Sequence, residues 1–326
     1  MQAKNRIGKV GAFLLPLLAL FFVLAGQLLP AHGAAAGDQV PVSGDSAWRQ
    51  ELLKERGGKD SEFKTSATSP MAGSARLTIT APGKTFITVM DGTVSTQPLA
   101  GTGAVFAVFF KQGKWYWDTA APEVTCRQAE RDIAPKVEAL PPGGFFKVDR
   151  FTLAAYPGSD TLALIVFDPQ RPQLLEFKHL LYFPPDARYA VKARLEIFPE
   201  KREVKILTTR QLEKTFYRYA RVHFTLQGRD LVLTALKTSL EGADAGYLFI
   251  PFKDASNGRE TYEVGRFIDV PDPGQADFIL DFNRCYNPLC NYSPAYNCPL
   301  PPLENFLDVA VPAGEKAYPH QEKNEL

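Results

Sequence analysis

Three cysteines lie in a stretch rich in proline, tyrosine and asparagine, DFNRCYNPLCNYSPAYNCPLPPLEN at residues 281–305. Cys285, Cys290 and Cys298 have the spacing C-x4-C-x7-C, which lacks the paired C-x2-C knuckles of structural zinc sites. A catalytic thiol needs a base, usually histidine, to take its proton, and this stretch contains no histidine. We therefore expect no metal site and no cofactor here, and a thiol nucleophile is disfavoured.

A disulfide is the favoured interpretation of this stretch, because the cysteines of an exported chain meet an oxidising environment. A bond between Cys290 and Cys298 would close a short loop that contains Pro294. In the chain-entropy treatment, closing a loop of this size stabilises the folded state by about 2.5 kcal/mol. Cys285 and Cys126 could then pair or stay free, since four cysteines allow three complete pairings and the sequence does not choose.

Polar residues around the cysteines form the candidate ligand-binding site. An Asn-Gly turn at residues 257–258 would reverse the chain, and the returning strand would carry Tyr262 and Arg266 on one side. Asp281 and Asn283 share a side of the next strand, so we predict an ion pair between Arg266 and Asp281. The predicted site residues are Tyr262, Arg266, Asp281, Asn283, Tyr286, Asn287, Glu304 and Asn305. Two interpretations stay open: these groups bind a ligand or act in catalysis, or they satisfy the backbone of a long irregular loop.

Familiar catalytic signatures are absent from the sequence. It contains no G-x-S-x-G elbow, no G-x4-G-K-[ST] phosphate loop, no H-E-x-x-H, and no G-x-G-x-x-G between a strand and a helix. A dispersed active site stays open, because paired carboxylates can do acid–base chemistry without histidine. Asp254, Asp281 and Glu304 are the carboxylates that such an enzyme would use.

The elements that would position these residues are mostly strands. Runs rich in Val, Ile, Phe, Tyr and Thr recur about every ten to fifteen residues between Gly, Pro, Asn and Asp. We therefore predict an all-β fold with two antiparallel β-sandwich or barrel-like lobes. One short N-terminal helix is expected over residues 46–64, with Ser46 as its N-cap and Gly57-Gly58 as a break or stop.

The prolines of DPQRPQ, residues 168–173, mark the expected linker between the lobes. The predicted organisation is a signal peptide at 1–33, a helical segment and linker at 34–70, a first β lobe at 71–170, a second β lobe at 171–318 and a flexible tail at 319–326.

One hairpin shows the period-two alternation of a half-buried strand. In TFYRYARVHFTL, the side chains of Phe216, Ala220 and Val222 fall on one face. A turn at Gln227-Gly228 would join this strand to the next. Arg218 interrupts the apolar face, so we expect it at an edge or paired with an acid.

The N-terminal segment has the charged, apolar and small-residue order of a secretory signal peptide. Three basic residues precede an apolar run over about residues 12–29, and small residues follow at 31, 33 and 34–36. An uncleaved anchor is the alternative, because the run approaches the length of a bilayer span. Cleavage is favoured, which would leave an exported protein, periplasmic or extracellular, with no integral membrane segment. The net charge is +1 and would fall to about −2 without the signal, so no nucleic-acid partner is expected.

Motifs of the second half resemble a known family. They are FPPDARY at residues 183–189, PFKDASNGRETYEVGRF at 251–267, and the stretch that begins DFNRCYNPLC and is followed by AGEK. Over about residues 172–316 the chain resembles the bacterial domain-of-unknown-function family 1684, whose name implies no function. The resemblance implies a β-rich first half similar to forkhead-associated domains. Residues 71–170 lack the Gly-Arg and Ser-x-x-His elements of such a phosphopeptide reader, so that activity is not expected.

The family resemblance also bears on the cysteines. It implies a small residue at the position of Cys285, which favours pairing Cys290 with Cys298.

The sequence thus predicts an exported β-rich binding or structural module, with an unknown small molecule, glycan or peptide as its partner. The alternative is a hydrolase-like enzyme that uses carboxylates near residues 281–305. Two carboxyl groups facing each other across a cleft would favour the enzyme, whereas burial of Asp281 against Arg266 would favour the module.

Overall fold

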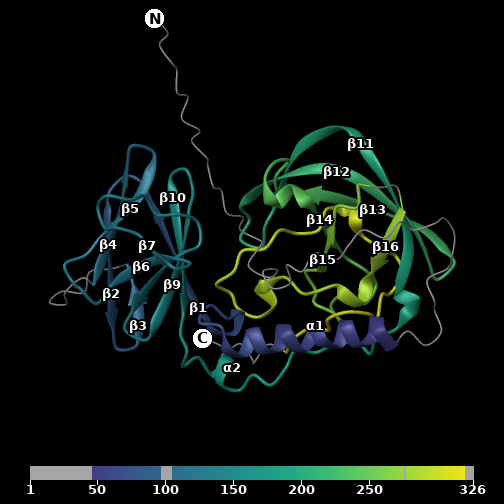
Figure 1. Cartoon of the computed structure of the whole chain (residues 1–326), viewed down its shortest axis with the longest axis horizontal. Coiled ribbons are helices and arrows are strands. Elements are labelled where there is room, and N and C mark those ends of the chain that lie inside the picture. The colour runs from purple at the N-terminus through teal and green to yellow at the C-terminus, as the bar shows by residue number, and fades with distance from the viewer. Residues whose placement is uncertain (1–45, 97–104, 275–276, 320–326) are drawn as a thin grey trace, which may run out of the picture.

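The computed structural model describes residues 46–96, 105–274 and 277–319 of the chain. The predicted signal peptide and most of the predicted tail lie outside these residues. None of the helices within them is both long and apolar enough to cross a membrane. The described part of the chain is mostly β, with antiparallel sheets in two lobes and one N-terminal helix (Figure 1), which confirms the predicted fold class.

The N-terminal helix α1 (Ser46–Thr65) is continuous through its two glycines, so the predicted break at residues 57–58 is wrong. Its buried side chains, Leu52, Arg56 and Phe63, lie on one stripe of the helix. This stripe packs along the second lobe (Figure 1), and Arg56 donates hydrogen bonds to two of that lobe's carbonyls. Tertiary packing therefore offsets the cost of the glycines, about 1 kcal/mol each.

The first lobe is a sandwich of two antiparallel sheets, with strand orders β1-β10-β9-β8-β6-β7 and β3-β2-β4-β5. Its strands are β1 (Gly73–Thr80), β2 (Lys84–Met90), β3 (Thr93–Ser95), β4 (Phe106–Lys111), β5 (Lys114–Asp118), β6 (Thr125–Gln128), β7 (Arg131–Asp132), β8 (Gly144–Val148), β9 (Phe151–Pro157) and β10 (Thr161–Phe167). Large aromatic side chains such as Phe106, Trp115 and Phe146 fill the core between the sheets.

The second lobe is a six-stranded antiparallel sheet that curls into a near-barrel, in the order β15-β14-β13-β12-β11-β16. Its strands are β11 (Ala190–Leu207), β12 (Glu213–Leu226), β13 (Arg229–Lys237), β14 (Tyr247–Phe252), β15 (Arg266–Pro271) and β16 (Asp277–Asp281). The hairpin predicted at Gln227-Gly228 is confirmed, because both turn residues have positive φ and β12 pairs with β13. Phe224, Phe252 and Phe282 lie in the core.

Short helical turns connect the strands and continue the chain after β16. They are η2 (Pro70–Ala72), α2 (Pro172–Leu175), η3 (Ala187–Tyr189), η4 (Ala243–Gly246), η5 (Phe282–Arg284), η6 (Leu289–Asn291) and η7 (Leu303–Asn305). Residues 282–319 form no strand of a sheet, yet many of them are buried. This C-terminal segment must satisfy its backbone by other means.

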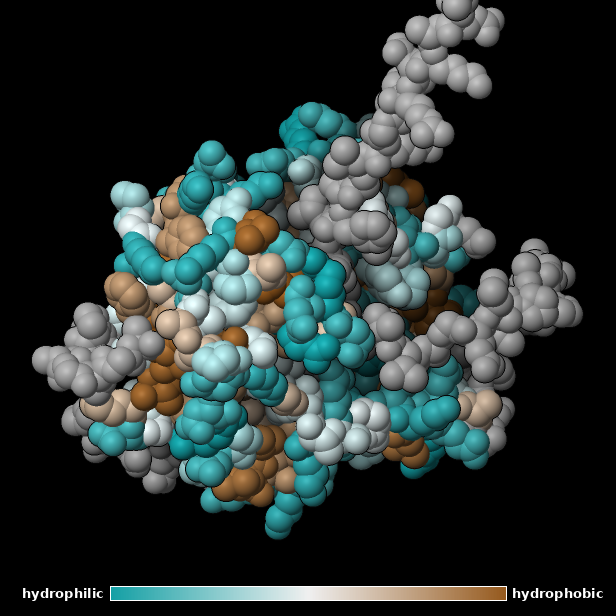
Figure 2. Space-filling model, turned by 60° about the vertical axis from the view of Figure 1, so that its left-hand side comes forward, coloured by the Kyte–Doolittle hydropathy of each residue, from teal (hydrophilic) through white to brown (hydrophobic). Residues whose placement is uncertain are grey.

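A separate apolar cluster joins the two lobes. Phe167 and Ala154 of the first lobe share it with Phe216, Phe249 and Phe267 of the second. On the face shown in Figure 2, by contrast, apolar residues form small separate patches among hydrophilic ones. The buried cluster is therefore where apolar packing fixes one lobe on the other.

Candidate functional site

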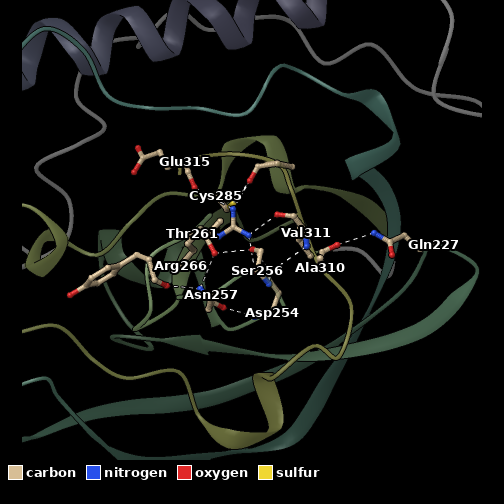
Figure 3. Close-up of polar contacts among 12 residues, drawn as sticks. Gln227, Asp254, Ser256, Asn257, Thr261, Arg266, Cys285, Ala310, Val311 and Glu315 are labelled. Carbon is tan, nitrogen blue, oxygen red and sulfur yellow. Dashed lines mark hydrogen bonds and ion pairs between the residues drawn. The ribbon is translucent and has the colours of Figure 1, made fainter. Parts of the chain in front are cut away.

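Arg266 is the centre of the predicted site and is completely buried. Its Nη2 lies 2.6 Å from a carboxylate oxygen of Asp254, which is equally buried. The same guanidinium donates hydrogen bonds to the carbonyls of Val311, Ala313 and Glu315 (Figure 3). Arg266 is the first residue of β15. Its side chain therefore connects the C-terminal segment to the start of this strand.

The carboxylate of Asp254 organises the turn that follows β14. It accepts hydrogen bonds from the backbone N–H and the hydroxyl of Ser256 and from the N–H of Val311 (Figure 3). Asn257 donates to the backbone carbonyl of Tyr262 at 2.6 Å, so the predicted turn closes on the returning chain. The turn and the C-terminal segment thus share one buried carboxylate.

The predicted ion pair between Arg266 and Asp281 is wrong. β15 and β16 lie at opposite ends of the strand order, and side-chain alternation alone could not show this. Asp281 instead accepts hydrogen bonds from the indole of Trp48, at 2.8 Å, and from Arg284. It also accepts from the backbone and amide of Asn283, and so caps the turn η5.

Asn283 extends this network to the FPPDARY loop. Its side-chain oxygen accepts from the N–H of Asp186 and its amide donates to the carbonyl of Asp186, both at 2.9 Å. This two-way bond sets the position of residues 183–189. An open groove of about 570 Å³ lies there, lined by Pro184, Pro185, Asp186, Ala187, Arg188, Tyr189 and Pro312.

Glu315 is a second buried carboxylate in the C-terminal segment. It pairs with Lys59 of α1 and accepts from the N–H of Asn287, at 2.7 Å, and the hydroxyl of Tyr292. Asn287 also donates to the carbonyl of Lys316 at 2.7 Å. Burial raises the pKa of the Tyr292 phenol well above its usual value, so this group stays a neutral donor.

Tyr286 faces a different carboxyl, that of Asp269 on β15. The phenol donates to Asp269 at 2.5 Å, and the ammonium of Lys59 lies 4.9 Å from the centre of the Tyr286 ring. Asp269 is exposed, but the surrounding protein displaces water and raises its pKa to about 6, despite the phenol and Lys59. The sequence analysis missed Asp269, because nothing in FIDV distinguishes it from any other polar strand residue.

Glu304 and Asn305 have separate roles. Glu304 is exposed and lies 3.2 Å from Arg218, which confirms that Arg218 has an acidic partner. Asn305 is buried, accepts from the N–H of Thr234 and donates to the carbonyls of Thr234 and Pro251. It thus fixes the turn η7 to β13 and β14.

The cysteines do not form the predicted disulfide between Cys290 and Cys298, because all four are free thiols in the structure. Cys290 and Cys298 are nonetheless neighbours, and the N–H of Cys290 donates to the sulfur of Cys298 at 3.3 Å. The hydroxyl of Tyr262 donates to the Cys290 sulfur at 3.6 Å. The Cys298 thiol holds the pKa of Cys290 below its usual value, and the pKa of Cys298 is raised. Cys285 is buried elsewhere, beside the carbonyl of Ala313.

The eight predicted site residues therefore do not converge on one cavity. Within residues 46–96, 105–274 and 277–319, no three His, Cys, Asp or Glu side chains are arranged to hold a metal ion. The groove beside Asn283 is the open feature that the predicted residues help to build. The sequence analysis did not predict a site at the residues that line this groove, although it noted the FPPDARY motif.

Residues 175–316 match a family model described as a protein of unknown function, DUF1684. The match confirms the resemblance predicted for this part of the chain. Among solved structures, the chain is similar to an uncharacterized protein of Haloarcula marismortui, studied by solution NMR. The identity is 33%, the match covers 46% of this chain and 82% of that one, and the TM-score is 0.39. A search of curated proteins found no match.

Proposed function

We propose that this DUF1684 protein is an exported binding module, and that an extended peptide segment occupies the groove at residues 184–189. One observation carries the proposal. Two segments line this groove, and a buried polar residue of the family motifs positions each of them. Asn283 positions the FPPDARY loop, and Arg266 positions the C-terminal segment. Their arrangement supports a binding surface built on a rigid frame.

The chemistry of the groove favours a peptide. Three of its lining residues are prolines, Pro184, Pro185 and Pro312, whose carbonyls accept hydrogen bonds but whose nitrogens cannot donate. A ligand must therefore supply donors, and an extended backbone does so with its N–H groups. Tyr189 is largely buried, so no open aromatic ring is offered for a sugar to stack on.

Arg188 would set the charge of the ligand. It is exposed at the rim of the groove and pairs with Asp186 at 2.6 Å. A carboxylate on the peptide could replace Asp186 as the partner of Arg188 or bind Arg188 beside it, in a bidentate arrangement that guanidinium groups favour.

The proposal of export rests on the order of residues in the N-terminal segment. The intact mass of the secreted protein would identify the cleavage site.

The test uses a peptide selected from a displayed random library and labelled for fluorescence anisotropy. Arg188→Ala is expected to weaken its binding about tenfold, the effect of losing one charge-assisted hydrogen bond. Arg202→Ala is a matched control, because Arg202 is also exposed and pairs with a carboxylate two residues earlier, Glu200. Equal binding by wild type and both variants would refute the groove as the site, as would failure to select any peptide.

The alternative, a hydrolase that uses Asp254, Asp281 or Glu304, has less support. Asp254 is enclosed with Arg266, Asp281 caps a turn, and Glu304 pairs with Arg218 on the surface. Each carboxylate has its own structural partner, so none of the three is left to take a proton from a substrate.

A further inference from the structure

A basic side chain of the first lobe, Arg76, lies on the face of its sheet that meets the second lobe. Ala75 and Leu77, its neighbours on β1, pack against the core of the first lobe, so alternation places Arg76 on the opposite face. It is paired across the strands with Ile165, which belongs to the apolar cluster that joins the lobes. The guanidinium of Arg76 is thus held at the edge of the interface between the lobes.

A second arginine, Arg210, reaches the same edge from the other lobe. It lies in the turn between β11 and β12, where its N–H donates to the side chain of Asn297 at 3.1 Å and its guanidinium donates to the carbonyl of Pro294. This stretch touches the first lobe directly, because the hydroxyl of Ser293 donates to the carbonyl of Gly73 at 2.6 Å. The contacts with residues 293–297 therefore place Arg210 beside β1.

The two arginines are close enough to repel each other. Burial lowers the pKa of Arg76, the positive charge of Arg210 lowers it further, and the nearby phenol of Tyr156 opposes both effects. Within the described ranges no carboxylate forms an ion pair with either guanidinium, and Arg76 makes no hydrogen bond there. Arg210 is exposed, but Arg76 is partly buried, and a partly desolvated charge beside a like charge without a counter-charge is unfavourable.

We propose that the edge of this interface binds a small tetrahedral oxyanion, of the phosphate and sulfate class, between Arg76 of the first lobe and Arg210 of the second. The planar guanidinium matches the geometry of such oxyanions in a bidentate manner. Tyr156 packs against the same apolar cluster, and we expect its hydroxyl to donate a further hydrogen bond to the anion. The bound anion would link the two lobes. This site is separate from the groove at residues 184–189, so either proposal can fail without the other.

The test is calorimetric titration of the purified protein with inorganic phosphate, and separately with sulfate, in potassium chloride of matched ionic strength. We expect saturable binding that Arg76→Gln and Arg210→Gln each weaken about tenfold or more. Arg202→Gln is the control, since Arg202 has a carboxylate partner at 2.8 Å. Absence of saturable binding for both anions would overturn the proposal.

A second readout separates this role from a merely structural one. Without the anion, Arg76→Gln should melt no lower than wild type, because it relieves the repulsion, and phosphate should raise the Tm of wild type but not of the variant. A lower Tm of Arg76→Gln in chloride alone would show a structural arginine and overturn the proposal. An equal, unsaturated rise in Tm for all variants would show a general salt effect, an adventitious ion only, and would overturn it too.

Discussion

At the scale of single residues, the second lobe depends on charges that are entirely removed from water. The pair formed by Asp254 and Arg266 has no exposed surface on either side chain. Such a pair is weak evidence of net stabilisation, yet removing one partner leaves an uncompensated buried charge. Here the same two groups also make four hydrogen bonds with the backbone of the C-terminal segment, two with Val311 and one each with Ala313 and Glu315.

Replacing Asp254 by Ala is therefore expected to lower the free energy of unfolding by about 3–5 kcal/mol, measured by urea denaturation. The control is Asp308→Ala, which breaks the exposed pair of Asp308 with Arg229 and should change stability by about 1 kcal/mol or less. Comparable small losses in both variants would contradict the view that the buried pair holds the C-terminal segment.

The sequence indicated which polar residues of this lobe have structural roles, but it did not indicate their hydrogen-bond and ion-pair partners. Arg266, Asn283 and Asn305 are all buried and bonded, as expected of groups that satisfy an irregular loop. Local alternation predicted the pair of Arg266 with Asp281, but the order of strands in a sheet is a non-local property. The ion-pair partner of Arg266 is Asp254, which lies in the connection between β14 and β15.

At the scale of elements, α1 shows how packing overrides propensity. The pair of glycines predicted a break, and local propensity alone would favour one. The helix continues because its buried stripe lies against the second lobe on both sides of the glycines, through Leu52, Arg56 and Phe63. The strands and the hairpin at Gln227-Gly228 were predictable, since alternation and turn chemistry act locally.

Gly57→Ala and Gly58→Ala should together raise the free energy of unfolding by about 1–2 kcal/mol. Both glycines are exposed, and an added Cβ would meet no atom within 4 Å at either one. Denaturant midpoints would measure the change.

Gly314→Ala is the opposite case and serves as the control. Its φ is +74°, and an added Cβ would lie 2.3 Å from the sulfur of Cys285, so this variant should be destabilised. A loss of stability in the two helix variants would contradict a continuous α1.

At the scale of the whole molecule, the cluster between the lobes decides whether they unfold as one unit. Phe249 and Phe267 form a T-shaped ring pair with centres 4.9 Å apart, and Phe167 of the first lobe packs into the same cluster. These side chains are nearly or completely buried. An interface with such an apolar centre should make the lobes cooperative.

Two buried thiols can report on the lobes separately. Cys126 lies in the core of the first lobe and Cys285 in the core of the second, and burial raises the pKa of each to about 12 and about 11. Each reacts with an alkylating reagent only when its own lobe opens. Pulsed alkylation across a urea series, read by peptide mass spectrometry, should label both cysteines at the same urea concentration in wild type.

Phe167→Ala should uncouple the lobes, because it removes a large side chain from the shared cluster at a cost of about 3–5 kcal/mol. Cys126 and Cys285 should then become labelled at different urea concentrations. The control is Leu175→Ala, which truncates an exposed side chain and should keep the two transitions together. Separate transitions already in wild type would show that the apolar cluster does not couple the lobes, and an anion held by Arg76 and Arg210 would then be expected to bring the transitions together.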